Sequence, residues 1–237
     1  MAAVNRMPPI VLIPGAMSTA LSWRYQIDIL QRNRQIVVPD QHYSLTSIND
    51  MARDIAPRLP HRFDLVGWSM GGYIAFELYP LIRDRVRKLI LVSTSAQPET
   101  KEAHARREKT LQSIEAEGLH AVLSRLFDCD LFDASKIDPH FKKSIVSDAA
   151  RMGETTLRNQ SKAMTSRNDS RASLRAISCE VLVIAGSHDP ITPIERSEEI
   201  VSLLPRPTLH IVHESGHCSP WEKSEEVNAA LQDFLGC

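Results

Sequence analysis

The stretch from residue 64 to residue 78 constrains the fold of this 237-residue chain more than any other. It begins as a short apolar run, which is typical of a buried strand, and continues with apolar residues at helical spacing. Between the two lies the sequence Gly-Trp-Ser-Met-Gly at 67–71, followed by Gly72. A strand that becomes a helix so abruptly strains the residue at the turn and needs small neighbours. We therefore expect Ser69 to project its hydroxyl from the edge of a sheet, at the positive N-terminus of a helix.

Short apolar runs alternate with amphipathic helical segments through most of the chain. The runs that fit buried strands lie at 9–13, 35–38, 63–67, 88–92, 180–186 and 208–212. Strands that alternate with helices predict an α/β fold, with a doubly wound, mostly parallel sheet and right-handed crossovers. Such sheets bind ligands beyond the carboxyl ends of their strands. Four residues of interest fall at that edge, namely Gly15, Ser69, Asp189 and His217.

The alternation stops between Gln97 and Ala176. This stretch has no run rich in Val and Ile, and its pattern predicts amphipathic helices at roughly 99–117, 119–128, 136–151 and 154–166. A chain of 237 residues suits one α/β domain with a moderate insertion better than two separate domains. We therefore expect a single domain over 1–237 that carries a helical insertion at 97–176.

The composition narrows the classes of partner. The formal net charge of −1 gives no sign of binding to nucleic acid or to an anionic membrane. No run approaches the roughly 20 apolar residues of a membrane span, and the N-terminus lacks the apolar core of a signal peptide. The four cysteines show no C-x-x-C spacing. We expect a cytoplasmic protein without nucleic-acid or membrane partners, and the sequence leaves its oligomeric state open.

A nucleophilic serine needs a general base within hydrogen-bond reach, whereas an incidental serine in a glycine-rich turn does not. The chain offers nine histidines as candidate bases for Ser69. His217 is the best placed, because its loop directly follows the last apolar run. His42 and His188 also lie near the carboxyl edge of the predicted sheet and remain alternatives.

His210, His213 and His217 also form an H-x2-H-x3-H pattern, which invites a metal interpretation. Residues three apart on a strand face opposite sides of the sheet, so His210 and His213 would not converge on one ion. We therefore expect no metal site at this position.

A histidine base works best beside a buried carboxylate, which holds its tautomer and offsets its developing charge. Asp189 follows an apolar run and occupies the loop next to that of His217 at the predicted edge. Capping of the next helix is its alternative role, although Thr192 is better placed for a cap. Glu99 is the acid nearest the fourth run, but it lies several residues beyond the end of that run. The order Ser69, Asp189, His217 matches one known nucleophile, acid and base arrangement.

A tetrahedral intermediate at Ser69 would need two backbone N–H donors for its oxyanion. Met70 follows the serine at the start of the predicted helix, and its amide is one candidate. The loop after the first run supplies the other, because Gly15 allows close approach of the backbone, and Ala16 is the expected donor. Loss of one such donor typically costs about 3 kcal/mol of transition-state stabilisation.

Four motifs together resemble the α/β-hydrolase superfamily across the span from Pro9 to Leu235. They read Val-Leu-Ile-Pro-Gly-Ala at 11–16, Gly-Trp-Ser-Met-Gly-Gly at 67–72, Gly-Ser-His-Asp-Pro-Ile-Thr-Pro at 186–193 and Ser-Gly-His at 215–217. The chain is most similar to small esterases and lactonases with a helical cap, and the second motif is similar to that of pimeloyl-carrier methyl ester esterases. The resemblance implies no cofactor, a cap at 97–176 and an acyl-enzyme on Ser69.

Some residues depart from the patterns of particular relatives. Pro14 stands where relatives usually carry a His before the oxyanion-loop glycine, which changes the support of that loop. The turn 40–44 lacks the glycines that relatives often carry, so the entrance on that side is expected to differ. Ser69 sets aside haloalkane dehalogenases and epoxide hydrolases, which use an Asp nucleophile. Cys218 sets aside plant hydroxynitrile lyases, which place a Lys directly after the His.

The sequence thus predicts a serine hydrolase that cleaves a carboxylic ester or lactone of a small apolar substrate. Trp68, Phe127 and Phe132 are expected to contact that substrate. Leu131 and Phe141 are further candidates to line a pocket, and plain helix packing is the alternative role for each of these cap residues. The same triad could instead serve C–C bond hydrolysis, thioester cleavage or perhydrolysis, or belong to a small-molecule receptor with slow turnover.

Overall fold

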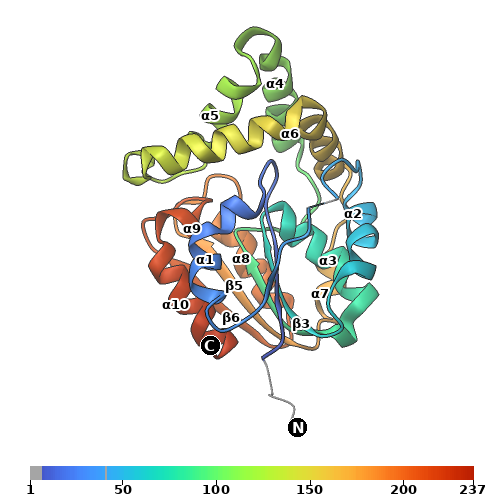
Figure 1. The fold of residues 1–237 in the computed structure, drawn as a ribbon. Coiled ribbons are helices and arrows are strands. Elements are labelled where there is room, and N and C mark those ends of the chain that lie inside the picture. The colour runs from blue at the N-terminus through green and yellow to red at the C-terminus, as the bar shows by residue number, and fades with distance from the viewer. Residues whose placement is uncertain (1–6, 41) are drawn as a thin grey trace.

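A computed structural model describes residues 7–40 and 42–237. In this part of the chain, six strands form one parallel sheet in the order β2-β1-β3-β4-β5-β6 (Figure 1). The strands are β1 (Ile10–Ile13), β2 (Ile36–Val37), β3 (Phe63–Trp68), β4 (Val86–Val92), β5 (Glu180–Gly186) and β6 (Pro207–Val212). The prediction of an α/β fold with a doubly wound parallel sheet and a helical insertion is therefore confirmed.

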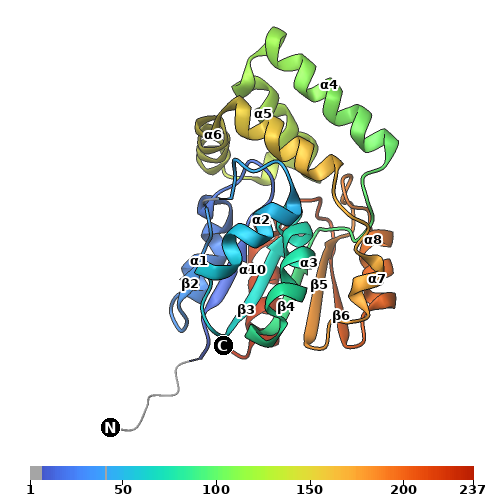
Figure 2. The same cartoon turned by 90° about the vertical axis from the view of Figure 1, so that its right-hand side faces the viewer.

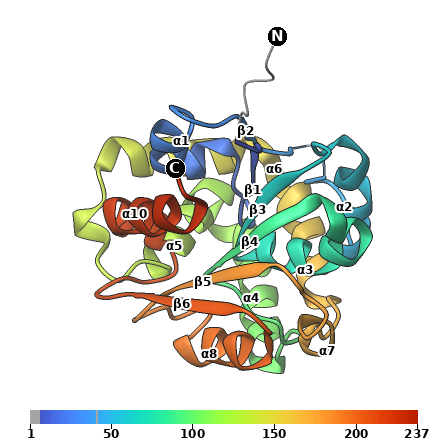
Figure 3. The same ribbon diagram turned by 90° about the horizontal axis from the view of Figure 1, so that it is seen from below.

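Helices cover both faces of the sheet, as the view from below shows (Figure 3). One face carries α1 (Arg24–Leu30) and α10 (Ser224–Leu235), and the other carries α2 (Ile48–Ile55), α3 (Met70–Ile82) and α8 (Ile194–Leu203). The two cores share strands, because successive side chains of a strand point to opposite faces. In β1, Val11 and Ile13 pack into one core, while Ile10 and Leu12 pack into the other. The sheet is therefore buried on both faces, which is why its runs are continuously apolar.

Parallel pairing brings the carboxyl ends of the strands to one edge. Gly67 of β3 lies opposite Ile13 of β1 on one side and Leu91 of β4 on the other. Leu91 in turn pairs with Val183 of β5. The loops after β1, β3, β4 and β5 therefore emerge side by side, which is the geometry that parallel α/β sheets use for ligand sites.

The helical insertion consists of α4 (Lys101–Glu117), α5 (Leu119–Cys129) and α6 (Pro139–Thr165), and it lies over this edge (Figure 2). The helices predicted at 136–151 and 154–166 are the two halves of α6. They are divided at Gly153, whose backbone angles of φ 85° and ψ 163° lie outside the helical region. A glycine adopts these angles without the steric cost that other residues incur. The predicted limits of the insertion, 97–176, stay a prediction.

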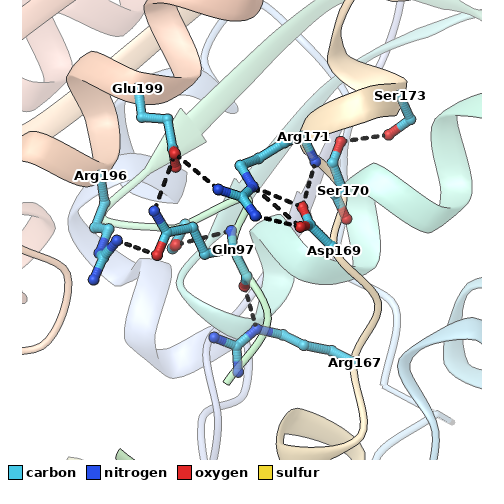
Figure 4. A network of polar contacts seen from close by, with 9 residues as sticks. Gln97, Arg167, Asp169, Ser170, Arg171, Ser173, Arg196 and Glu199 are labelled. Atoms are coloured by element: carbon cyan, nitrogen blue, oxygen red, sulfur yellow. Dashed lines mark hydrogen bonds and ion pairs between the residues drawn. The ribbon is translucent and has the colours of Figure 1, made fainter. Parts of the chain in front are cut away.

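The two connections of the insertion are fastened to each other and to α8 (Figure 4). Ser170 donates its N–H to the carbonyl of Ala96 at 2.9 Å, and Arg167 Nε donates to the carbonyl of Gln97 at 3.0 Å. Gln97 Nε2 in turn donates to Glu199 Oε1 of α8 at 3.0 Å. The short helix α7 (Arg171–Leu174) follows this junction. The connections thus form one polar network at the base of the insertion.

Two further features of the helices complete the fold. Ser47 caps α2, since its Oγ accepts the N–H of Asp50 at 3.3 Å. After β6 the chain forms two helices, α9 (Ser219–Glu222) and α10, with Lys223 between them. Among the described residues, no helix combines the length and apolarity that crossing a membrane requires.

Candidate active site

Ser69 occupies the sharp turn between β3 and α3. Its backbone angles are φ 54° and ψ −115°, a conformation that non-glycine residues rarely adopt. The turn is tight enough that a Cβ added to Gly67 would lie 2.5 Å from the carbonyl oxygen of Gly71. A Cβ added to Gly71 would lie 2.2 Å from the carbonyl oxygen of Ile13. The glycines of the motif therefore let α3 begin directly against the ends of β1 and β3.

A line of hydrogen bonds runs from Ser69 through His217 to Asp189. Ser69 Oγ lies 2.9 Å from His217 Nε2, and His217 Nδ1 lies 2.8 Å from Asp189 Oδ2. Because an ionised carboxylate only accepts hydrogen bonds, Nδ1–H is the donor to Asp189. Nε2 of the neutral ring is then left as an acceptor for the Ser69 hydroxyl. The three predicted residues, distant in sequence, thus meet in the geometry of a nucleophile, a base and an acid.

Asp189 is held by the turn in which it lies. Its Oδ1 accepts the backbone N–H groups of Ile191 and Thr192, each at 2.8 Å, and its Oδ2 accepts the Thr192 hydroxyl at 2.7 Å. The alternative role as a cap of the next helix does not apply. That helix, α8, begins at Ile194 after Pro193, without a side-chain cap. The carboxylate is instead fully buried and aimed at the imidazole.

Burial and charge act in opposite directions on this pair. Burial of the imidazole opposes its protonation, but the negative charge of Asp189, aided by Asp130 and Glu222, raises the pKa of His217 above its ordinary value of 6.5. Burial likewise opposes ionisation of Asp189, whereas the positive charge of His217 and the hydrogen bonds from His217 and Thr192 lower the pKa of Asp189. Each partner therefore stabilises the charged form of the other.

The loop that carries His217 is fixed from two sides. The backbone N–H of His217 donates to the carbonyl of Asp130 at 2.7 Å. The carbonyl of His217 accepts the indole N–H of Trp68 at 3.1 Å. Gly216 has no room for a side chain, since an added Cβ would lie 2.6 Å from the carbonyl oxygen of Asp130. The end of α5 in the insertion therefore packs directly on the loop and helps to hold the imidazole in place.

The two segments expected to stabilise an oxyanion lie beside Ser69. Met70 is the first residue of α3, so its N–H has no acceptor within the helix. A Cβ added to Gly15 would lie 3.4 Å from Ser69 Cβ, which shows how closely the loop after β1 passes. Ala16, the next residue, lines the same cavity as Ser69. The structure thus brings both segments together, and their role as donors stays a prediction.

A cavity of about 830 Å³ opens above Ser69 and His217, between the sheet edge and the insertion. Trp68 and Phe127, two of the three aromatic residues expected to contact substrate, line it. Phe132 does not. Its side chain is 42% exposed, and its ring lies 4.5 Å from that of His188 at an angle of 41°, outside the cavity. The backbone N–H of Phe132 donates to Glu222 Oε2 at 2.8 Å, which holds this part of the chain after α5.

The two additional pocket candidates from the sequence pack as core residues. Phe141 is buried against Tyr25 and Trp221, with ring centroids 4.9 and 5.7 Å away. Leu131 is buried in the same apolar cluster. Neither is among the residues that line the large cavity. Helix packing, the alternative that the sequence left open, is therefore their observed role.

One wall of the cavity is charged, which the sequence did not predict. Glu99, which is 4% exposed, pairs with Arg107 at 3.1 Å and with Arg167. The Arg167 guanidinium also lies 4.3 Å from the centroid of the Tyr73 ring. All four residues line the cavity. Glu99 is thus engaged by two arginines, and Asp189 is the acid bound to His217.

Asp130 is a second carboxylate that the sequence did not single out. It lines the cavity, and burial raises the pKa of its carboxyl group to about 6, against the attraction of His217. Asp130 directly follows Cys129, the last residue of α5. No local sequence signal marks it, because its position depends on how α5 packs against the loop of His217.

The alternative histidines lie elsewhere. His42 is fully buried beside Tyr43, and burial lowers the pKa of its imidazole to about 4. His188 lies 2.8 Å from the Ser187 hydroxyl through Nδ1. His210 contacts Glu226 at 3.1 Å. In the described ranges, no group of three or more His, Cys, Asp or Glu residues is arranged to hold a metal ion.

Known proteins with similar sequences include two named hydrolases. The chain is 28% identical to a pimeloyl-[acyl-carrier protein] methyl ester esterase from Nitrosomonas europaea, over 89% of this chain and 88% of the relative. It is 24% identical to a 2-hydroxymuconate semialdehyde hydrolase from a Pseudomonas species, over 96% of this chain and 86% of the relative. The two relatives thus act, by their names, on different substrates.

A solved structure shows the same architecture. A thermophilic esterase from Thermogutta terrifontis superposes with a TM-score of 0.83 at 26% sequence identity, covering 96% of this chain and 89% of the esterase. A family described as the alpha/beta hydrolase family matches residues 10–230, which span the sheet, the insertion and all three members of the hydrogen-bonded line. The chain therefore belongs to the alpha/beta hydrolase family.

Proposed function

We propose that this hydrolase cleaves a carboxylic ester or lactone of a small substrate through an acyl-enzyme on Ser69. The observation that carries the proposal is the continuous line from Ser69 Oγ through His217 to Asp189, at the floor of a cavity of about 830 Å³. A volume of this size lies within the range of small-molecule sites. The names of the methyl ester esterase and of the thermophilic esterase support an ester as the bond that is cleaved.

The first step is attack of Ser69 Oγ on the ester carbonyl carbon. Nε2 of His217 takes the hydroxyl proton as the new C–O bond forms, since a neutral hydroxyl is a poor nucleophile. Asp189 keeps Nδ1 protonated and stabilises the imidazolium that results. The raised pKa of His217 favours this proton transfer, and it requires that the ring be neutral at the start.

The negative charge that develops on the carbonyl oxygen is assigned to two backbone amides. We propose Met70 N–H at the start of α3 and Ala16 N–H in the loop after β1 as the donors. The tetrahedral intermediate then collapses, the C–O bond to the alcohol breaks, and His217 returns its proton to the leaving oxygen. Water, deprotonated by His217, attacks the acyl-enzyme in the same way and regenerates the Ser69 hydroxyl.

The cavity favours a substrate with one apolar end and one polar end. Phe127, Leu157 and Met164 line its apolar part, and Arg107 and Arg167 line its charged wall. This supports a small acyl group beside the apolar residues and a polar group beside the arginines. Trp68 also borders the cavity, but its indole N–H is already bound to the His217 carbonyl, so we assign it to the support of that loop.

Hydrolysis of a carbon–carbon bond is the second candidate. The similarity to a 2-hydroxymuconate semialdehyde hydrolase, which extends over 96% of this chain, favours it. The same serine, histidine and carboxylate arrangement would serve in both reactions. A substrate panel of esters and lactones of varied chain length, together with vinylogous diketones, separates the two, since only the true class gives turnover dependent on Ser69.

Replacement of Ser69 tests the proposal directly. We expect Ser69→Ala to lose hydrolysis of p-nitrophenyl esters and covalent labelling by a fluorophosphonate, because both require the nucleophilic oxygen. Ser202→Ala is the matched control, since the Ser202 hydroxyl is exposed and donates to the carbonyl of Glu199 in its own helix. Ester turnover by Ser69→Ala at the wild-type rate would overturn the assignment.

A further inference from the structure

The second half of α6 presents an unusual face to the site. Leu157, Gln160, Ser161 and Met164 follow helical spacing, and each is at most 5% exposed. Leu157, Ser161 and Met164 line the cavity above Ser69, but Gln160 does not. A fully buried glutamine on an otherwise mostly apolar face is costly unless it makes a hydrogen bond. The hydrogen-bond partner of Gln160 therefore indicates the role of this side chain.

Gln160 accepts a hydrogen bond from the loop that follows β1. The backbone N–H of Met17 donates to Gln160 Oε1 at 2.8 Å, in a fully buried contact that joins residues 143 positions apart. Met17 directly follows Ala16, the residue proposed above as an oxyanion donor. Gln160 thus binds the peptide group between Ala16 and Met17, which directly follows the peptide group that carries the proposed donor, Ala16 N–H (Figure 1 shows α6 above this loop).

The backbone at Met17 is expected to rearrange if this hydrogen bond is lost, for two reasons. Its φ is 50°, in the left-handed region that a side chain with a Cβ makes unfavourable. Such conformations persist only where the surroundings hold them. Removal of the acceptor would also leave a buried N–H without a partner, which is a second reason for the loop to rearrange.

A second contact joins the same loop to the same helix. Thr19 Oγ1 donates to Asp148 Oδ2 in the first half of α6, and it also accepts the N–H of Leu21 at the start of the next helical turn. The loop from Gly15 to Thr19 is thus attached to α6 on both sides of the Gly153 break. Of these two contacts, the one from Gln160 lies nearer in sequence to Ala16.

We propose that Gln160 is a positioning residue for the oxyanion site. Through Met17 it holds the Ala16 N–H toward the substrate carbonyl, so that the helical insertion completes the site as well as covering it. The inference rests on the proposed function, because it concerns the same oxyanion. Gln160 acts through Met17 and does not line the cavity, so its loss should weaken transition-state stabilisation and leave substrate binding nearly unchanged.

Two substitutions at position 160 separate the hydrogen bond from packing. Gln160→Met keeps the length of the side chain and removes the amide oxygen. Gln160→Glu retains an oxygen acceptor for Met17 N–H, and it breaks no other hydrogen bond within the described part of the chain, where Gln160 Nε2 has no partner. We expect kcat to fall about tenfold in Gln160→Met, short of the 10²–10³ lost when an oxyanion donor is removed outright. We expect Gln160→Glu to retain most of the wild-type kcat.

Asn159→Leu is the matched control. Asn159 is the neighbour of Gln160 in α6, and its Nδ2 also joins the insertion to the sheet domain, by donating to the carbonyl of Ser44 at 2.8 Å. Among the described residues, no hydrogen bond joins the Asn159 side chain to the loop after β1. If Gln160 only fastened the insertion, the two variants would behave alike. We expect Asn159→Leu to retain the wild-type kcat even where its melting temperature falls.

The decisive measurement compares two kinds of inhibitor on folded protein, well below the melting temperature. A trifluoromethyl ketone forms a tetrahedral oxyanion on Ser69, so its Ki should rise in Gln160→Met by the factor by which kcat/KM falls. KM and the Ki of the corresponding unreactive alcohol should change by less than about twofold. Should Gln160→Met fail to fold, Gln160→Asn, which withdraws the amide from Met17, is expected to show the same pattern.

Three outcomes would overturn the proposal: an unchanged kcat in Gln160→Met, an equal loss in Asn159→Leu, or a rise in KM without loss of kcat. Each of these leaves the proposed function standing, since the wild-type enzyme is still active. Absence of Ser69-dependent ester turnover in the wild type is a different result. It would remove the proposed function, and the positioning role with it.

Discussion

The imidazole of His217 lies between a hydroxyl and a carboxylate, and its protonation decides whether Ser69 can be activated. Burial of the ring opposes its protonation, but the charge and hydrogen bond of Asp189, together with the charges of Asp130 and Glu222, raise the pKa of His217 above 6.5. In the proposed mechanism the neutral ring is the base, so kcat/KM should rise as pH increases through this pKa and then level off. The strained backbone at Ser69 and the buried Asp189 carboxylate thus place one oxygen atom at each of the two nitrogens of the His217 ring.

Replacement of Asp189 by Asn should change both the height and the position of this profile. The rate on the plateau is expected to fall by roughly 10⁴-fold, as is typical when the triad carboxylate becomes an amide. The midpoint of the acid limb should move to lower pH, since burial then lowers the pKa of His217 with less opposing charge. The measurement is kcat/KM against pH, with Asp133→Asn, which alters an accessible carboxylate of the insertion, as control. A limb that stays in place would contradict the pairing.

At the scale of helices, buried charge joins the start of the insertion to its end. Glu99 precedes α4, and Arg167 follows α6, yet they pair with side chains that are 4% and 9% exposed. Arg107 in α4 binds the same carboxylate. A buried charge that loses its partner is strongly destabilising, whereas an exposed pair contributes little. The two ends of the insertion are therefore held together by one carboxylate.

Two equivalent substitutions test this difference. Glu99→Gln should lower the free energy of unfolding by about 3 kcal/mol, because two arginines are left without the charge that balances them. Glu117→Gln removes the same charge from the exposed pair with Arg125 and should cost less than about 1 kcal/mol. Urea denaturation of both variants provides the comparison. Similar losses in the two proteins would show that the Glu99 pairs are no stronger than surface contacts.

At the scale of the whole molecule, the insertion and the sheet domain meet along the loops that carry the site. The end of α5 holds the His217 loop through the carbonyl of Asp130, and α6 holds the loop after β1 through Gln160. The Gly153 break in α6 sets the direction of its second half. Catalysis and the placement of the insertion should therefore be linked, and two glycines of the insertion allow this link to be measured.

Gly153 and Gly118 have nearly the same backbone conformation, with φ of 85° and 80°, and neither has atoms within 4 Å of an added Cβ. Alanine at either position should therefore cost a similar 1–3 kcal/mol or so of stability, through backbone strain alone. Gly153→Ala should in addition lower kcat several-fold, because it redirects the half-helix that carries Gln160. Gly118→Ala, between α4 and α5, should leave kcat unchanged. Thermal unfolding and ester kinetics on both variants check this, and equal kinetics would contradict the link.

Local pattern was enough to predict much of the molecule. The continuous apolar runs predict strands buried on both faces, and the glycines at 67–72 predict the tight turn at Ser69. Both depend on neighbours in sequence, because strand burial and turn sterics are set within a few residues. The chain order of Ser69, Asp189 and His217, with each at the end of a run, follows from the same reasoning, since parallel strands end at one edge.

The rest depended on contacts between distant residues. Gln160 and Met17 are 143 positions apart, and no pattern near either residue in the sequence predicts the hydrogen bond between them. A polar residue at a core-facing position of a predicted helix was the only local sign. The sequence predicted that Phe132 lines the pocket, but its side chain is exposed and its backbone N–H is bound to Glu222, 90 positions away. The sequence by itself determined the sheet, the turn and the positions of Ser69, Asp189 and His217 at one edge, because these obey local sterics and periodicity. Only the tertiary structure decided which side chains of the insertion reach the site, because that depends on how two packed layers meet.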